Sequence, residues 1–337
     1  MAKGLRNKIG PFLTSLTQPN PFWKAYSSPS WWLQLFKRRR LKTKDYRLKT
    51  NDSPIYVIFT CDLELDPPWN KESWEEQTSF GLEQGTPILL NLLKRYKIKA
   101  TFFCEGRLAK THPHLIKELK DEDHEIGCHG WAHEGYGGHY RLDRFLPRIR
   151  VLKMSEKREY ILKAKKGLEE LTGTEVVSFR APFLMIDSST MALLDELGFL
   201  VDSSLYNILF GRIRPYHPKD KNFLREGNLK IVEIPISINP VPRLLPHYPY
   251  GSIYSQEAVK FAFNSSNLEN IPTIILLMVH PWEFVEIENP PGILIGERRT
   301  ELLDEFLKGL LILDNLQFVT ISQMARIWED EHCPFHT

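Results

Sequence analysis

The sequence has only four cysteines among its 337 residues, and no two of them form a C-x-x-C pair. A disulfide framework is not expected in a chain of this size with so few cysteines. Cys61, Cys104 and Cys128 each stand at the end of an apolar run. We therefore expect the cysteines to be small buried hydrophobic residues.

The sequence also lacks a long apolar run. Its longest, Thr273 to Val279, is far shorter than the roughly 20 residues with which a helix crosses a bilayer. No basic stretch followed by an apolar segment opens the chain, so no secretory signal is predicted. We expect an intracellular, cytoplasmic protein.

No internal repeat and no Gly/Ser-rich linker divides the chain, but its charge is unevenly distributed. Residues 1–50 contain twelve basic residues and one acidic residue, Asp45, whereas the whole chain has a net charge of only +2. The rest of the chain is therefore acidic. The simplest division is a basic, aromatic N-terminal extension, residues 1–50, followed by one catalytic domain, residues 51–337.

The N-terminal extension leads from aromatic residues into the cluster Lys37-Arg38-Arg39-Arg40. Indole rings favour the headgroup region of a membrane, and each nearby Lys or Arg gains about 1 kcal/mol against anionic lipid. Peripheral contact at the inner membrane face is therefore one hypothesis, and a solvated extension whose tryptophans pack on the domain is the other. Nucleic acid would also attract this charge, but it is not an expected partner, and the oligomeric state stays open.

From residue 54 onward, short apolar runs alternate with segments of helical periodicity. The strand-like runs are Ile55–Thr60, Ala100–Cys104, Glu125–Cys128, Val176–Phe179, Phe199–Val201, Ile231–Ile236, Ile274–Val279 and Phe318–Ile321. The helix-like segments are Leu82–Tyr96, Pro113–Lys120, Glu156–Leu171, Ser189–Leu197, Gln256–Asn264 and Arg299–Leu311. This alternation predicts an α/β fold with a parallel sheet, open or closed into a barrel.

Smaller signals mark the ends of these elements. Gly173 and Gly198 stand where helix C-termini belong, and Asp187 or Ser188 is placed to cap a helix N-terminus. Residues 202–230 and 237–254 are rich in Pro, Tyr, Arg and His. We expect both segments to be long loops that shape a substrate site.

Asp62 and Glu64 follow the first predicted strand directly. In an extended segment alternate side chains share a face, so both carboxylates point the same way while Leu63 points into the opposite layer. The carboxyl ends of parallel strands are where α/β sheets and barrels place their active sites. Two neighbouring carboxylates are costly without a cation or a shared proton, so the pair indicates a metal site. The simpler interpretation is a solvated acidic turn.

A second strand-like run leads into His129 and His133. In one turn of helix this spacing puts both imidazoles on one face, within reach of a single ion, and Gly130 between them permits a tight turn. Imidazole and carboxylate together are suitable ligands for zinc. Two ordinary surface histidines would give the same pattern.

Arg180 and His280 also follow apolar runs. Arg180 could hold a carboxylate bidentately, or it could form an ordinary surface salt bridge. His280 could act as a general acid or base near its unperturbed pKa of about 6.5, or it could be a structural histidine bonded to a backbone carbonyl. Polar groups thus follow four separate apolar strands, and this conjunction favours a catalytic site.

These residues resemble the signatures of the polysaccharide deacetylases, carbohydrate esterase family four, which share the NodB-homology domain. The family motifs T-F-D-D-G, H-[ST]-x-x-H, R-x-P-[YF] and L-x-x-H have counterparts here in the same order. They are Thr60-Cys-Asp-Leu-Glu64, His129-Gly-Trp-Ala-His133, Arg180-Ala-Pro-Phe183 and Leu277-Met-Val-His280. The resemblance extends over residues 54–325. The variant forms are similar to the branch with peptidoglycan-deacetylase-like and allantoinase-like members.

The resemblance implies a single-domain, distorted (β/α) barrel of about seven strands. It also implies a divalent metal, often zinc, held by one carboxylate and two histidines. Carried over to this sequence, the metal ligands would be Glu64, His129 and His133. Asp62 would be the catalytic base, Arg180 the residue that orients this base, and His280 the general acid.

The sequence departs from the family pattern at three places. Leu63 stands where the family has its ligating Asp, so Glu64 must reach the metal from one position later. Phe183 replaces the commoner Tyr, which costs little if the backbone N–H at that position is the group that contacts substrate. The D-x-x-D-W motif has no counterpart, which leaves Asp202 as the candidate to orient His280.

The implied activity is metal-dependent removal of the acetyl group from an N-acetylated sugar, which is a glycan or a nucleotide- or lipid-linked precursor. Hydrolysis of a small cyclic amide or ureide, as in allantoinase-like members, is the alternative. A non-catalytic carbohydrate-binding protein is a third hypothesis, against which Asp62 and His280 argue. Aromatic residues that would stack on sugar rings, if they are not core residues, are Trp69, Trp131, Trp282 and Tyr248.

Overall fold

The computed structural model describes residues 54–66, 77–137, 150–205, 214–237, 272–287, 295–313 and 315–332. Expectations that lie outside these residues concern the extension 1–50, the loop 237–254, the helix Gln256–Asn264, and Trp69, Tyr248 and Cys333. Membrane contact through residues 1–50 therefore stays a prediction. Among the described residues, no helix combines the length and the apolar character that crossing a membrane requires.

The strands of the main sheet all pair in parallel. They are β1 (Ile55–Leu63), β2 (Thr101–Cys104), β3 (Glu125–Cys128), β4 (Ser178–Phe179), β5 (Val201–Asp202), β8 (Val232–Glu233), β9 (Thr273–Val279) and β10 (Leu316–Val319). Their order is β10-β1-β2-β3-β4-β5-β8, and β9 pairs with β1. Each strand overlaps one of the predicted apolar runs, because strands of a parallel sheet are buried on both faces.

The sheet curls so that its two ends meet. Both edges of β1 are paired, and the segment that follows β8 at the other end of the sheet bonds to β9. One edge of β1 pairs with β9, and the other pairs first with β10 and then with β2. Beyond β8, the N–H of Ser237 donates to the carbonyl of Leu276 at 3.2 Å, and the N–H of Leu276 donates to Ser237 Oγ at 3.0 Å. The result is the distorted barrel that was predicted.

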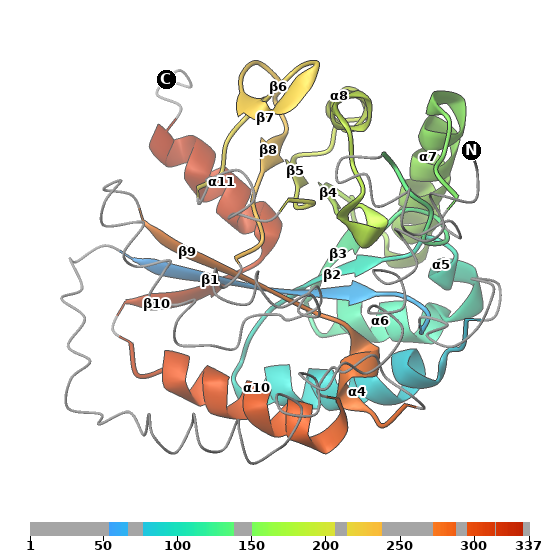
Figure 1. The fold of residues 1–337 in the computed structure, drawn as a ribbon. Helices are drawn as coiled ribbons and strands as arrows, with labels where there is room; N and C mark the ends of the chain where they lie inside the picture. Colours follow the sequence, from blue (N-terminus) through green and yellow to red (C-terminus); the bar gives the residue numbers. More distant parts are fainter. Residues whose placement is uncertain are drawn as a thin grey trace, which may run out of the picture. The chain divides into compact units, whose positions relative to one another are not determined.

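Helices cover the outside of this sheet (Figure 1). They are α4 (Phe80–Arg95), α5 (Leu108–Thr111), α6 (Pro113–Asp121), α7 (Met154–Thr172), α8 (Ser188–Glu196) and α10 (Gly296–Leu310). α4 and α10 lie side by side, joined by Asp304, which accepts hydrogen bonds from Arg95 (2.8 Å) and Tyr96 (2.6 Å). Asp187 caps α8 through the N–H of Thr190 at 2.8 Å, which confirms that expectation.

Two segments differ from the sequence-based expectations. The run that was predicted to continue as a strand to Ile321 instead turns into α11 (Ile321–His332), whose first N–H groups are capped by side chains of the sheet. Ile321 N–H donates to Thr101 Oγ1, and Ser322 N–H donates to a carboxylate oxygen of Glu125. Residues 202–230, expected as a loop, contain the antiparallel hairpin of β6 (Pro218–Lys219) and β7 (Asn222–Glu226).

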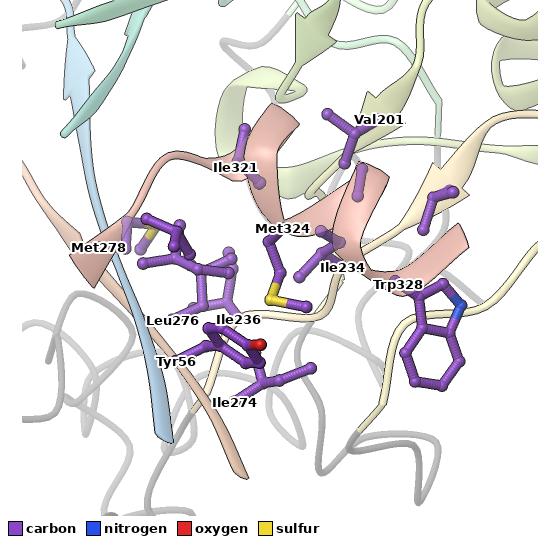
Figure 2. Close-up of a cluster of buried hydrophobic side chains, with 14 of the residues drawn as sticks. Tyr56, Val201, Ile234, Ile236, Ile274, Leu276, Met278, Ile321, Met324 and Trp328 are labelled. Atoms are coloured by element: carbon purple, nitrogen blue, oxygen red, sulfur yellow. The ribbon is translucent and has the colours of Figure 1, made fainter. Parts of the chain in front are cut away.

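The inner face of the barrel changes from apolar to polar along the strand direction. On β1, Tyr56 and Ile58 share a face with Asp62, and on β9 Met278 shares a face with His280. The apolar part packs against α11 (Figure 2), in a cluster that includes Tyr56, Ile58, Ile274, Leu276, Met278, Met324 and Trp328. Burying one such side chain stabilises the fold by roughly 1.5–3 kcal/mol. The polar ends of the same strands are left to build a site.

A buried histidine away from that site makes stability depend on pH. His124 is 7% exposed, and its Nδ1 accepts a hydrogen bond from the N–H of Ala100 at 3.0 Å, so this nitrogen carries no proton. Burial, aided by the charge of Lys99, lowers the pKa of His124 from 6.5 to about 4. Protonation therefore favours the unfolded chain, and stability present above pH 6.5 is lost as pH falls toward 4. Over this range the free energy of unfolding falls by up to about 3 kcal/mol.

Urea unfolding at pH 7 and pH 4.5 measures this loss. The variant His124→Gln, which keeps an acceptor for Ala100, is expected to lose less stability between the two pH values than the wild type. His114→Gln on the exposed surface is the control and should lose as much as the wild type. An equal loss in the wild type and His124→Gln would assign the pH dependence to other groups.

Candidate active site and metal centre

Three carboxylates, Asp62, Glu64 and Asp66, stand at or just after the end of β1 and have different surroundings. Asp66 accepts hydrogen bonds from the N–H groups of Gly81 (2.7 Å) and Leu82 (3.0 Å), so it caps the N-terminus of α4. Asp62 and Glu64 are 3% and 4% exposed and lie at the carboxyl end of β1. Only these two carboxylates are therefore placed for chemistry inside the barrel.

His129 and His133 stand on a turn rather than on the helical turn that their spacing suggested. The N–H of His129 still continues the sheet by donating to the carbonyl of Cys104 at 2.8 Å. Gly130 then has a φ of 70° and His133 a φ of 67°, both left-handed. A Cβ at Gly130 would lie 2.8 Å from the ring of Tyr136, so the turn requires glycine there. The left-handed His133 is a strained conformation of the kind found at functional sites.

The turn brings both imidazoles to Glu64. Glu64 Oε2 lies 2.6 Å from Nε2 of His133 and 3.3 Å from Nε2 of His129. One ligand atom from each of the three side chains lies within 4.8 Å of the other two. The Nδ1 of His129 is 2.9 Å from the carbonyl of Arg180, which fixes a tautomer whose Nε2 lone pair points at the cluster. This donor set fits a zinc-type cation with one coordination position left over.

Charges within the cluster oppose the effect of burial on the pKa values of Glu64 and His133. Burial alone would raise the pKa of the Glu64 carboxyl, but His133 and His280 hold it well below its ordinary value. Burial alone would lower the pKa of His133, and Glu64 raises it instead. The negative charge thus stays on the carboxylate, as a cation ligand requires.

Asp62 is held by Arg180 at the same edge of the sheet. The guanidinium is fully buried, and its Nη1 donates to Asp62 Oδ1 at 2.7 Å and to Thr60 Oγ1 at 2.8 Å. Its Nε donates to the carbonyl of Ser203 at 2.8 Å, and its plane lies over the ring of Phe103. Asp62 Oδ1 is therefore engaged, and Oδ2 lies 3.8 Å from Nε2 of His280.

His280 is oriented by Glu283, a residue that the sequence reasoning missed. Nδ1 of His280 lies 2.9 Å from Glu283 Oε1, and Arg299 donates to Glu283 Oε2 from Nε at 2.7 Å. Nε2 of His280 is 3.8 Å from both Asp62 and Glu64. Burial would lower the pKa of His280, but these carboxylates raise it to about 9. The available signal was the acidic residue three positions after the histidine in His-Pro-Trp-Glu.

Asp202 does not orient His280, so that expectation is corrected. Its carboxylate accepts hydrogen bonds from the N–H (3.1 Å) and Oγ (2.8 Å) of Ser204, and Glu233 stands opposite it in the pairing of β5 with β8. Burial raises the pKa of Asp202. Because Ser204 Oγ also accepts from the N–H of Ala181 at 2.9 Å, Asp202 supports the segment that carries Arg180. It lies on the opposite face of β5 from the site, as alternation requires.

The aromatic residues that were expected to contact sugar differ in their burial and contacts. Trp282 is 0% exposed, stacks on His280 at 4.9 Å and donates to Glu64 Oε1 at 3.4 Å. A ring without exposed surface offers nothing to a sugar, so that assignment is corrected. Trp131 is half-buried, with Lys163 Nζ 3.7 Å from its ring centre. Phe183 has a φ of 55° and its ring lies edge-on to His133 at 4.2 Å.

Part of the chain is similar to a known protein family. Residues 75–201 match the family model described as polysaccharide deacetylase. This segment of the chain is thus similar to the polysaccharide deacetylase family. The matched segment contains the two histidines and Arg180, whereas Asp62 and His280 lie outside it. The fold itself brings the remaining groups to the same edge of the sheet.

Relatives and solved structures extend the likeness beyond that segment. A peptidoglycan deacetylase of Helicobacter pylori is 30% identical over 158 residues, which cover 45% of this chain and 50% of that protein. The chain thus spans about half the length of this relative. A Mycobacterium smegmatis protein assigned as a polysaccharide deacetylase superimposes with a TM-score of 0.59 at 23% identity, over 84% of this chain and 92% of its own. PuuE allantoinase superimposes with a TM-score of 0.58 at 19% identity, over 84% of this chain and 93% of its own. The structural likenesses establish a shared fold.

Proposed function

We propose that this protein is a metal-dependent hydrolase that removes the acetyl group from an N-acetylated sugar. The observation that carries the proposal is the convergence of Glu64, His129 and His133, with Asp62 and His280 beside them, at the carboxyl ends of the strands. The peptidoglycan deacetylase of H. pylori supports the substrate class, because its name assigns it an N-acetylated glycan.

Glu64, His129 and His133 would hold the divalent cation, and zinc fits this donor set. When bound, such a cation supplies Lewis acidity to a carbonyl and to water. The protein contributes a fixed ligand geometry, since the carbonyl of Arg180 sets the tautomer of His129. Trp282, which donates to Glu64 Oε1, restrains the carboxylate on its other oxygen.

Asp62 is the general base in this proposal. Its Oδ1 is engaged by Arg180, so Oδ2 is the oxygen that takes the proton from the attacking water. The fixed guanidinium prevents the carboxylate from turning away. Because Arg180 is itself bonded to Thr60 and Ser203, the base is held by groups from three strand ends.

His280 is the general acid, because a departing amine needs a proton. Its pKa of about 9 keeps the imidazole charged at neutral pH, and Glu283 orients it so that Nε2 faces Asp62 and Glu64. The backbone N–H of Phe183 is the donor that we assign to the oxyanion, and one such donor is typically worth about 3 kcal/mol. The products are acetate and a free amino sugar.

Hydrolysis of a small cyclic ureide is the second candidate. PuuE allantoinase shares the fold over 93% of its length, and the same base and acid could open a ring amide. A polymer or a linked sugar needs an open groove, whereas a ureide needs a small closed pocket.

An acetate-release screen separates the two candidates. Purified protein loaded with zinc is incubated with N-acetylglucosamine oligomers, peptidoglycan fragments, nucleotide- and lipid-linked N-acetylated sugars, and allantoin. We expect acetate from at least one of the sugars and no opening of allantoin. Ring opening of allantoin without acetate release would select the second candidate, and no turnover of any of them would contradict the proposed hydrolase.

A further inference from the structure

Two carboxyl groups outside the metal centre face each other across neighbouring strands. Asp202 of β5 is in register with Glu233 of β8, so both side chains stand on the same face of the parallel sheet. Each of them is 0% exposed. The charge of Arg180 favours the ionised form of Asp202, but this guanidinium makes its salt bridge with Asp62. Within the described part of the chain, the carboxyl pair, Asp202 and Glu233, is therefore buried without a salt bridge of its own.

Hydrogen bonds account for three of the four oxygens of the carboxyl pair. Asp202 accepts from Oγ (2.8 Å) and N–H (3.1 Å) of Ser204, one bond on each oxygen. Glu233 Oε1 accepts from the N–H of Leu205 at 3.1 Å. Glu233 Oε2 is buried, and no N–H or hydroxyl of the described residues donates to it. With both groups ionised, an unpaired carboxylate oxygen would therefore lie next to a second negative charge.

One shared proton removes both the repulsion and the unpaired oxygen. Two carboxylates in one buried site cannot both ionise without a large cost, so such a pair keeps one proton between its members. A proton on Glu233 Oε2 turns this atom into a donor, and the side chain of Asp202, which is in hydrogen-bonding contact with Glu233, is the acceptor. Burial, followed by the charge of Asp202, raises the pKa of Glu233 well above its ordinary value.

Titratable groups on the neighbouring elements are engaged elsewhere. The backbone of Tyr216 bridges to Glu233, but the hydroxyl of Tyr216 donates to the carbonyl of Phe223 at 2.9 Å. On α8, Asp195 accepts from the two N–H groups that precede β8, at 2.7 Å each. α11 packs against the other face of β5 and β8 through apolar side chains. The proton is therefore assigned to the carboxyl pair itself.

The segment after β5 connects the carboxyl pair to Arg180. Ser204 Oγ, which donates to Asp202, accepts from the N–H of Ala181 at 2.9 Å. The guanidinium of Arg180 donates to the carbonyl of Ser203 from Nε at 2.8 Å and to Ser203 Oγ from Nη2 at 3.0 Å. The carboxyl pair thus fixes this segment, and the segment fixes the side chain that holds the proposed base.

We propose that Glu233 carries a proton that it shares with Asp202, and that this hydrogen bond positions Arg180 through the segment after β5. Glu233 is thus a positioning residue, which acts through Arg180 rather than on the substrate. Its role in catalysis rests on the proposed hydrolase, whereas the shared proton and the position of the segment do not. Loss of the proton, or of the group that carries it, loosens the hold on Arg180.

The pH dependence of stability tests the shared proton. In the unfolded chain both acids ionise at about pH 4, whereas the folded pair keeps one proton. The unfolded chain then binds fewer protons, so this contribution to stability is full below about pH 4 and is lost as pH rises toward the raised pKa of Glu233. Glu233→Gln keeps an acceptor for Leu205 and a donor for Asp202, but it does not titrate. The wild-type unfolding constant, divided by that of Glu233→Gln, should therefore rise about tenfold per pH unit between about pH 5.5 and pH 7.

Urea unfolding of the full chain, at one zinc concentration and at about pH 5.5 and pH 7, measures this ratio. Glu175→Gln, at an exposed glutamate, is the matched control, and its ratio to the wild type should not change with pH. If Glu233→Gln does not fold, the double variant Asp202→Asn, Glu233→Gln replaces it, since its two amides can still bond to each other. A ratio that stays constant over this pH range overturns the shared proton.

Hydrogen exchange of the Ala181 amide tests the positioning role. Glu233→Met removes the donor to Asp202, and it is expected to speed this exchange at least about tenfold at pH 7, relative to the amide of Val57 in β1. Glu233→Gln should restore the wild-type rate. A wild-type rate in Glu233→Met, or a fast rate in Glu233→Gln, overturns the positioning role. Neither measurement depends on turnover, so a failure to release acetate contradicts the proposed function alone.

Discussion

Asp62→Asn is expected to lower acetate release by a factor of about 10² to 10⁴, the usual contribution of a general base, while zinc content and melting temperature stay close to the wild type. Asparagine has the same shape, and its carbonyl oxygen can still accept the hydrogen bond from Arg180. It cannot take a proton from water. Metal content by elemental analysis and acetate release on the same preparation measure the two properties together.

Asp66→Asn is the matched control for this loss. Asp66 is a buried carboxylate four residues further along the chain, and its contacts are the N–H groups at the start of α4. Asparagine keeps an acceptor for only one of these two N–H groups, so we expect nearly full activity with a moderate loss of stability. If Asp62→Asn retained activity, or if Asp66→Asn lost as much, the assignment of the base would be wrong.

Glu64→Gln is expected to lose both the metal and the activity. The substitution removes the negative charge from the cluster and leaves two neutral imidazoles with an amide, a set that divalent cations bind weakly. Affinity for zinc should fall by at least about a hundredfold, beyond the 10- to 100-fold that outer contacts typically contribute. Competition with a fluorescent zinc chelator measures this change without reference to turnover.

Glu134→Gln provides the comparison at a neighbouring carboxylate. Glu134 directly follows His133, is largely buried, and accepts a hydrogen bond from the N–H of Ala132 at 3.0 Å. The amide oxygen of glutamine can keep that bond, so zinc affinity should change by less than about tenfold, below the loss expected at Glu64. An equal loss of zinc in both variants would mean that the overall charge of the turn, rather than ligation by Glu64, holds the cation.

The sequence predicted the strands and the groups at their ends because both depend on local pattern. A parallel strand is a continuous apolar run, and the first polar residues after it stand at one edge of the sheet. Alternation along β1 also placed Asp62 and Glu64 on one face and Leu63 on the other. The structure has Leu63 fully buried and the two carboxylates at the site.

Features that depend on tertiary contact could not be predicted in the same way. The turn from His129 to His133 uses two left-handed residues, one of them a histidine, which the helical interpretation of an i, i+4 pair does not allow. Trp282 has the composition of a sugar-stacking residue, but it is buried where Gly81 lets α4 approach it. Glu283 contacts His280 from three positions along the chain, but its second partner, Arg299 of α10, is a tertiary contact that the sequence around His280 does not indicate.

The start of α11 shows a related difficulty. Ile321 is apolar and follows an apolar run, so propensity continues the strand through it. In the structure the side chains of Thr101 and Glu125, more than 190 residues earlier in the chain, cap the helix that begins there. A cap supplied by a distant strand leaves no signal near the helix.

The most direct test of the account is anomalous diffraction from zinc-grown crystals, with data collected above and below the zinc absorption edge. We predict one strong peak about 2.0–2.2 Å from Nε2 of His129, Nε2 of His133 and a carboxylate oxygen of Glu64. A peak at any other set of side chains, or no peak with these three residues in place, would contradict the proposed metal centre.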